Sequence, residues 1–127
     1  WRAVGVSTAA DVADVAPGPA DALLFDARPP AGAACEGGHG VAFDRAALRA
    51  YRAARPFVLA GGLTPDNVGP AVREARAVPG FCGVDVSSGV ERAGTGKRRK
   101  DPEKIARFVQ AAVAAFAEEP AQCASGA

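Results

Sequence analysis

The sequence predicts an α/β fold of parallel strands joined by helical crossovers. Four short apolar runs alternate with four segments of helical spacing, and this order is typical of parallel sheets with right-handed connections. Small or acidic residues close several runs, as at the ligand-binding carboxyl ends of strands in α/β folds. At 127 residues, the chain is long enough for one domain and too short for two ordinary ones. The predicted strands are residues 1–6, 21–27, 57–60 and 83–90.

The first unit is a β-prone run that continues into a helix. Thr8 and Asp11 have the spacing of a capping box, which satisfies free N–H groups at a helix start. The helix is expected to stop at residues 17–19, which read Pro-Gly-Pro. The residues that share its apolar face are Val12, Val15 and Ala16.

The second run, residues 21–27, closes with Asp26 at its carboxyl end. Acidic residues are poor strand formers, so Asp26 needs a specific reason at this position. Residues 28–42 are rich in Pro, Gly and Ala and predict a long mobile loop, a type of segment that is commonly functional in compact domains. Asp44 then begins a predicted helix that extends to about Arg55.

The third run, residues 57–60, leads into Gly61, Gly62, Thr64 and Pro65. Glycines allow a sharp turn and a close approach to a ligand, while Thr64 as N-cap and Pro65 after it favour a helix start. The free N–H groups of that start would suit a phosphate. A plain tight connection between strand and helix explains the same residues equally well. The predicted apolar stripe of the helix is Val68, Ala71, Val72 and Ala75.

The fourth run, residues 83–90, ends in Ser87, Ser88 and Gly89. This strengthens the phosphate interpretation, because the loops after the last two strands of (βα)8 barrels often hold a phosphate. The basic residues 97–100 are interpreted as a solvated loop before a last helix, which begins with Asp101 as N-cap and Pro102. Its predicted apolar face consists of Ile105, Phe108, Val109, Ala112, Val113 and Phe116.

Composition gives no support for a nucleic-acid or membrane partner. Fifteen basic and fourteen acidic residues leave a net charge of +1. No apolar span reaches the ~18 residues of a transmembrane helix, and the start has no signal-peptide pattern, so the expected location is cytoplasmic. The three cysteines Cys35, Cys82 and Cys123 and the single histidine His39 are scattered, so we expect no disulfide framework and no metal site.

Five motifs follow one another along nearly the whole chain. They are residues 21–27 (DALLFDA), residues 37–40 (GGHG) with Phe43 and Asp44, residues 57–63 (FVLAGGL) with Pro65, Asn67 and Val68, residues 84–91 (VDVSSGVE), and Lys100 with Asp101. Each motif alone has low specificity. The ordered set resembles the carboxyl-terminal half of phosphoribosylanthranilate isomerase, an enzyme family of tryptophan biosynthesis.

The resemblance implies that residues 1–117 form strands 5 to 8 of a (βα)8 barrel and that residues 118–127 are a flexible tail. It also implies the Amadori rearrangement of N-(5-phosphoribosyl)anthranilate to 1-(2-carboxyphenylamino)-1-deoxyribulose 5-phosphate, without a metal or an organic cofactor. The expected partners are this small sugar phosphate and a missing amino-terminal half-barrel, in the same or another chain. Because the chain begins with Trp1 in a strand-like run, we expect a piece of something longer that is inactive alone.

By the same resemblance, Asp26 matches the general acid that opens the ribose ring. This role requires a carboxyl group that holds a proton near neutral pH, which burial in an apolar mouth favours. The family's general base, a cysteine in a Lys-Ile-Cys-Gly-like motif at the end of the first strand, has no counterpart in this chain. The residues expected to bind substrate or phosphate are Gly38, Gly40, Gly61, Gly62, Asp85, Ser87, Ser88 and Gly89.

Each assignment has an alternative. Asp26 could instead cap a loop or pair with Arg28, the glycines and serines could serve turn geometry alone, and Asp85 could belong to a buried polar network. His39 stands where the family more often has Ser or Thr, and we expect it to be incidental. For the whole chain, the alternatives are another sugar-phosphate-binding barrel enzyme and a non-catalytic half-barrel used for binding or assembly.

Overall fold

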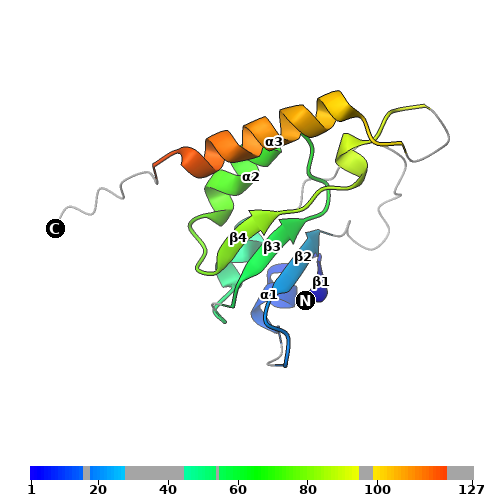
Figure 1. The fold of residues 1–127 in the computed structure, drawn as a ribbon. Coiled ribbons are helices and arrows are strands. Elements are labelled where there is room, and N and C mark those ends of the chain that lie inside the picture. Colours follow the sequence, from blue (N-terminus) through cyan, green and yellow to red (C-terminus); the bar gives the residue numbers. More distant parts are fainter. Residues whose placement is uncertain (16–17, 28–44, 54, 95–98, 120–127) are drawn as a thin grey trace.

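The computed structural model describes residues 1–15, 18–27, 45–53, 55–94 and 99–119. Within them, parallel strands form one sheet in the order β1-β2-β3-β4 (Figure 1). The strands are β1 (Arg2–Val6), β2 (Leu23–Ala27), β3 (Phe57–Ala60) and β4 (Phe81–Val84). The predicted parallel α/β fold is therefore confirmed, and β3 has the predicted bounds.

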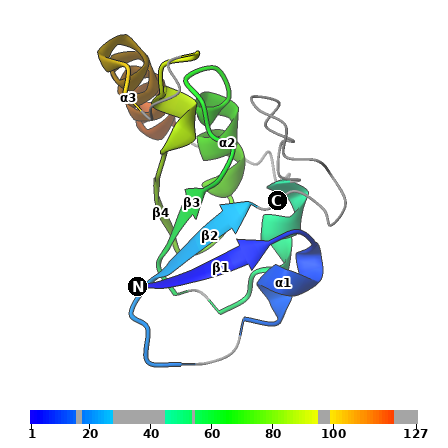
Figure 2. The ribbon, with the colours of Figure 1, turned by 90° about the vertical axis from the view of Figure 1, so that its right-hand side faces the viewer.

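The helical segments lie on one face of the sheet (Figure 2), except for the turn at Ser88–Val90, which lies beyond the carboxyl ends of the strands (Figure 1). In chain order they are α1 (Ala9–Ala13), the 3-10 helix η1 (Arg45–Ala50), α2 (Val68–Ala75), the 3-10 turn η2 (Ser88–Val90) and α3 (Pro102–Ala117). Helix α1 packs on β1 and η1, while α2 packs on β4, η1 and α3. The sheet is thus covered from one side by the described helices.

Alternate strand residues point toward these helices and form the core, as the two-residue period of a strand requires. Three aromatic rings from β2, β3 and the segment after η1 fill its centre. The ring centroids are 5.2 Å apart for Phe25 and Tyr51, 5.0 Å for Phe25 and Phe57, and 5.2 Å for Tyr51 and Phe57. The Tyr51 hydroxyl donates a 2.9 Å hydrogen bond to the Arg55 carbonyl, and burial raises the pKa of Tyr51.

The opposite face of the sheet carries smaller side chains. Leu24 and Val58, which are neighbours in the parallel register, are only half-buried there. Gly83 continues this row on β4, where an added Cβ would lie 3.5 Å from the Val58 side chain. The two apolar side chains on this face are therefore only partly covered.

Helix α2 begins three residues later than expected, although its predicted stripe is confirmed. Val68, Ala71, Val72 and Ala75 have no exposed surface. Thr64 still organises the helix start: the Thr64 hydroxyl accepts a 3.3 Å hydrogen bond from the Asn67 N–H, and the Asn67 side-chain oxygen accepts one of 2.7 Å from the Thr64 N–H. This reciprocal pair is capping-box chemistry, and it holds residues 65–67 in a turn that precedes the regular helix.

Two further boundaries differ from the prediction. The fourth strand was expected over residues 83–90, but β4 ends at Val84 and Ser88 begins the turn η2. The strand also starts earlier, at Phe81, because Phe81 pairs with Phe57 ahead of a register shift. The helix expected from Asp44 is the 3-10 helix η1, which closes with the Tyr51 N–H donating to the Leu48 carbonyl at 3.0 Å; Asp44 itself lies outside the described residues.

Helix α3 starts as predicted, with the Asp101 carboxylate accepting a 2.9 Å hydrogen bond from the Glu103 N–H. Its apolar residues, however, are not all buried. Phe108 and Ala112 belong to the core, whereas Ile105, Val109 and Val113 are 40%, 51% and 60% exposed. The predicted apolar face is therefore only partly buried, because the short helix α2 covers only part of the wide apolar stripe of α3.

The carboxyl end of α3 is bound to α2. The Arg73 guanidinium donates hydrogen bonds of 2.7 and 2.8 Å to the two carboxylate oxygens of Glu118. Their shared hydrogen bonds lower the pKa of Glu118 and raise the pKa of Arg73. Glu118, which the sequence places in the tail, is thus in contact with the domain; residues 120–127 lie outside the described part.

We predict that Phe57→Ala destabilises the chain by about 3–5 kcal/mol, because it removes a fully buried ring that contacts Phe25, Tyr51 and Phe81. Urea unfolding followed by circular dichroism measures the change. Trp1→Ala is the matched aromatic truncation, and since Trp1 is 76% exposed it should change the stability by less than about 0.5 kcal/mol. Equal effects of the two substitutions would contradict this core.

We also predict that Asp11 makes stability depend on pH. Its carboxylate accepts hydrogen bonds from the N–H groups of Ser7 and Thr8 at 2.8 and 2.9 Å, which lower the pKa of Asp11 below its ordinary value of 3.8. The resulting stability is present above that ordinary pKa and is lost as the pH falls through the folded-state pKa. Asp11→Asn should therefore flatten the fall in urea midpoint between about pH 5 and about pH 2.

Asp14→Asn is the control, since Asp14 belongs to the other end of the same helix. If Asp11→Asn and Asp14→Asn give the same pH profile as the unmodified chain, the Asp11 cap does not contribute to acid sensitivity.

Candidate active site at the carboxyl edge of the sheet

The turn after β3 is built on two glycines in the left-handed region. Gly61 has φ 88° and Gly62 has φ 65°, values that L-residues with a side chain rarely adopt. Asn67 fixes the turn from the following helix start, because its side-chain amide donates a 2.9 Å hydrogen bond to the Gly62 carbonyl. The local sequence therefore holds this turn in one conformation.

The turn η2 after β4 packs directly against the turn after β3. A Cβ added to Gly89 would lie 1.8 Å from the carbonyl oxygen of Leu63 and 3.2 Å from the Val86 side chain. Only a glycine permits this backbone-to-backbone contact. The structure thus brings two of the predicted phosphate turns together at the carboxyl edge of neighbouring strands.

Both turns present backbone donors. In the described part of the chain, the N–H groups of Gly61, Gly62, Ser88 and Gly89 donate no hydrogen bond. Successive free N–H groups in turns of this kind form anion-binding concavities. The geometry therefore fits an anion such as a phosphate, while the contact itself stays a prediction.

Asp26 lies beside these turns. It is at the carboxyl end of β2, in register with Gly5 of β1 and Ala60 of β3. Since Phe25 points into the core, the Asp26 side chain leaves the opposite face of the sheet, where it is half-buried. No donor or cation among the described residues bonds to its carboxylate.

Asp85 points to the helix-free face of the sheet, the same face as Asp26, as the alternation with Val84 and Val86 predicted. Its neighbours Val84 and Val86 pack against the core, and the Asp85 N–H extends the ladder by a 2.9 Å hydrogen bond to the Leu59 carbonyl. The side chain is exposed, so it is not part of a buried polar network within this chain. Gly38, His39 and Gly40 lie outside the described residues.

Lys100 was missed by the sequence interpretation, which assigned it to a solvated loop. Its ammonium group donates hydrogen bonds of 2.8 Å to the Ser87 carbonyl, 3.3 Å to the Ser87 hydroxyl and 3.1 Å to the Glu91 carboxylate. The pairing of residues 91 and 100 across an antiparallel bridge is a tertiary feature. The sequence offered two signals, the position of Lys100 beside the helix-capping Asp101 and its place in the fifth family motif, and neither identified the contact.

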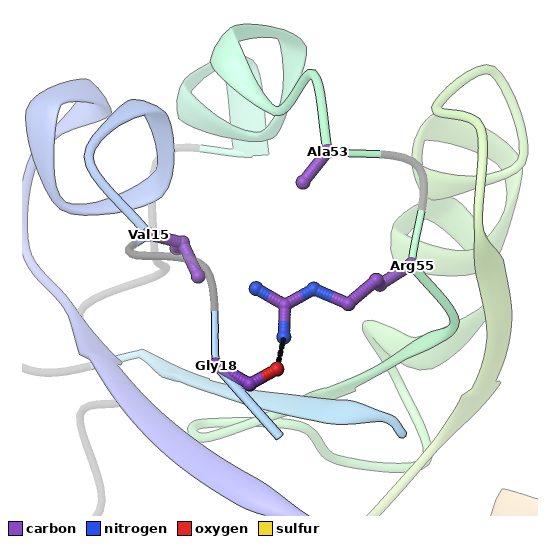
Figure 3. Close-up of a pocket in the computed structure, with 4 residues that line it drawn as sticks. All are labelled: Val15, Gly18, Ala53 and Arg55. Carbon is purple, nitrogen blue, oxygen red and sulfur yellow. Dashed lines mark hydrogen bonds between the residues drawn. The ribbon is translucent and has the colours of Figure 1, made fainter. Parts of the chain in front are cut away.

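A cavity of about 310 Å³ lies at the opposite edge of the sheet. It is lined by Val15, Gly18, Ala53 and Arg55 (Figure 3). The Arg55 guanidinium donates hydrogen bonds of 3.3 Å to the Gly18 carbonyl and 3.2 Å to the Ala20 carbonyl, and both carbonyls precede β2. The cavity is therefore at the amino ends of the strands, away from the glycine turns.

Two other site classes find no support among the described residues. No three His, Cys, Asp or Glu side chains of the described part gather closely enough to hold a metal ion. None of the helices described here has the length and apolar character needed to cross a membrane.

Comparison with known proteins identifies close relatives. Residues 1–111 match the family model of N-(5'-phosphoribosyl)anthranilate isomerase. The isomerase of that name from Hyphomonas neptunium is 46% identical over 121 residues, which cover 94% of this chain and 53% of the relative. The isomerase from Rhodospirillum rubrum is 48% identical, over 87% of this chain and 48% of the relative.

A solved structure supports the same relationship. The crystal structure of phosphoribosyl anthranilate isomerase from Thermotoga maritima superposes with a TM-score of 0.60 at 35% identity and covers 88% of this chain and 50% of that chain. This chain thus spans about half the length of the relatives that it matches.

We predict that Gly89→Ala destabilises the chain by about 2–3 kcal/mol, because its Cβ would force the two turns apart. Gly69→Ala is the matched control. Gly69 lies inside α2, and its Cβ would meet only the Arg73 guanidinium, at 3.4 Å, which is ordinary van der Waals contact, so that substitution should stabilise by about 0.5–1 kcal/mol. Urea unfolding of both variants measures the difference, and a neutral Gly89→Ala would contradict the close contact with Leu63.

Proposed function

Because the chain belongs to the N-(5'-phosphoribosyl)anthranilate isomerase family, we propose that it is the carboxyl-terminal half of such an isomerase and contributes its general acid and phosphate-binding turns. The observation that carries the proposal is the convergence of Asp26 and the two glycine turns on one edge of a parallel sheet. In (βα)8 enzymes this edge holds the active site, and phosphate often binds at the loops after the last two strands.

The reaction divides between an acid and a base. A general acid protonates the ribose ring oxygen, the ring opens to a Schiff base, and a general base removes the C2 proton so that the enol form collapses to the amino ketone. Asp26 supplies the first proton in this proposal. Its place on the helix-free face of the sheet supports the assignment, since that face becomes the interior of a closed barrel.

The phosphate of the substrate is assigned to the turns after β3 and β4. The N–H groups of Gly61, Gly62, Ser88 and Gly89 point to this role because they are free of partners in the described part of the chain. Hydroxyl groups of Ser87 and Ser88 add donors beside them. A related isomerase structure, with a TM-score of 0.53 and 27% identity over 88% of this chain and 47% of that chain, was solved with reduced 1-(o-carboxyphenylamino)-1-deoxyribulose 5-phosphate.

The general base is assigned to a partner half-barrel. Cys82 lies near the start of β4, and its thiol donates a 3.2 Å hydrogen bond to the carbonyl of Phe57 at the start of β3. Cys82 is therefore at the amino edge of the sheet, far along the strands from Asp26. Cys35 and Cys123 lie outside the described residues. A cysteine of the Lys-Ile-Cys-Gly-like motif in the other half fits the role better.

Three surfaces support the presence of a complementary half. Strands β1 and β4 are the edges of the described sheet, and edge strands offer unpaired backbone groups to further strands. Leu24 and Val58 leave apolar surface on the helix-free face. Finally, α3 exposes Ile105, Val109 and Val113 at helical spacing, as expected for a helix that packs between two neighbours in a closed ring.

We predict that this chain is inactive alone and forms an active isomerase when mixed with the amino-terminal half of the Hyphomonas neptunium relative. Consumption of the fluorescent substrate phosphoribosylanthranilate measures the activity. In the reconstituted enzyme, Asp26→Asn should lower kcat by about 10²- to 10⁴-fold, because the general acid is lost.

Asp21→Asn is the matched control, since Asp21 is exposed and precedes β2 at the other edge of the sheet. It should leave kcat unchanged. Full activity of the Asp26→Asn pair would remove Asp26 from the mechanism, and failure of both halves to bind each other would favour a different sugar-phosphate enzyme or a non-catalytic half-barrel.

A further inference from the structure

The ammonium group of Lys100 contacts residues on both sides of the turn η2. Residues 90–92 and 99–101 lie side by side through hydrogen bonds of 2.7 Å from the Asp101 N–H to the Val90 carbonyl and 2.8 Å from the Arg92 N–H to the Arg99 carbonyl. This pairing places Lys100 beside the turn. From there its side chain reaches Ser87, which precedes η2, and Glu91, which follows it.

All three donors of the Lys100 ammonium group are matched by these acceptors, namely the carbonyl and hydroxyl of Ser87 and the carboxylate of Glu91. Glu91 is fixed in turn by the backbone bridge to Lys100 and by Lys104 of α3, whose ammonium group donates a 2.8 Å hydrogen bond to the Glu91 carbonyl. Lys100 therefore joins both ends of η2, while the free N–H groups of Ser88 and Gly89 lie between them.

We propose that Lys100 is a positioning residue for the phosphate turn: by bridging Ser87 and Glu91 it holds the Ser88 and Gly89 N–H groups in the arrangement that binds the substrate phosphate. The proposal rests on the phosphate site assigned above. Lys100 acts through the turn and not as a direct ligand, because its donors already have acceptors within the chain.

The competing explanation is electrostatic, since any cation near the site would attract a phosphate. The two explanations predict opposite changes in phosphate affinity for the substitution Glu91→Gln. Glu91→Gln removes a negative charge beside the turn, so simple attraction predicts tighter phosphate binding. Loss of the Lys100 bridge between Ser87 and Glu91 predicts weaker phosphate binding, because a charge-assisted hydrogen bond that orders the turn is lost.

The test is a titration of the 127-residue chain with inorganic phosphate, followed by the NMR shifts of the Gly61, Gly62, Ser88 and Gly89 amides. We expect Lys100→Met to weaken binding about tenfold, the equivalent of one charged hydrogen bond, and Glu91→Gln to weaken it about threefold. Lys100→Arg, which keeps the charge and donors, should restore binding to within about threefold of the unmodified chain. Arg99→Met is the charge-matched control one residue away and should leave the affinity unchanged.

Hydrogen exchange of the backbone amides, measured without phosphate, tests independently whether the Lys100 bridge orders η2. The Val90 and Glu91 N–H groups close η2 through hydrogen bonds of 3.4 Å to the Ser87 carbonyl and 3.1 Å to the Ser88 carbonyl, so Lys100→Met should speed their exchange at least about tenfold while α2 stays protected. Unchanged exchange together with unchanged affinity in Lys100→Met, or tighter binding in Glu91→Gln, overturns the proposal. If phosphate does not shift these amide signals in the unmodified chain, the proposed phosphate site is wrong, and the positioning role of Lys100 is wrong with it.

Discussion

Burial of one face of the parallel sheet is the constraint from which the rest of the structure follows. The rings of Phe25, Tyr51 and Phe57 meet at about 5 Å in the centre of that face, and the helices cover it. Strand residues alternate, so the same packing fixes what the other face can carry. Because Phe25 is buried in the core, the Asp26 side chain must point to the opposite, helix-free face of the sheet.

The sequence was sufficient for features that depend on neighbouring residues. The apolar run of β3, the stripe of α2 and the Asp101-Pro102 start of α3 were predicted at or close to their observed positions, because period, capping and turn chemistry are local. The parallel order followed from the alternation of strand and helix patterns.

The features that were missed depend on residues far apart in the chain. Gly89 has no sequence signal for its contact with Leu63, and Lys100 has none for its bridge from Ser87 to Glu91. The exposure of Val109 and Val113 has the same origin. Helical spacing shows that these side chains are apolar and aligned, but whether a surface is buried depends on what else covers it.

The two edges of the sheet differ in how their backbone groups are satisfied, and this difference distinguishes the carboxyl edge, where the candidate site lies. At the amino edge the residues just before the strands pair with their neighbours: the Leu23 N–H donates to the Pro56 carbonyl and the Phe57 N–H to the Gly80 carbonyl. The Arg55 guanidinium, which lines the cavity at that edge, likewise donates hydrogen bonds to the Gly18 and Ala20 carbonyls.

At the carboxyl edge the chain leaves the sheet through the turns that follow β3 and β4, and N–H groups of the two turns have no intrachain acceptors in the described part. A free N–H is costly when it is buried, so these turns are stable only while they face water or an anion. The backbone contact at Gly89 and the Lys100 bridge hold both turns in this arrangement. The fold therefore concentrates the unpaired donors of the described residues beside Asp26, and the proposed phosphate and acid sites rest on this arrangement.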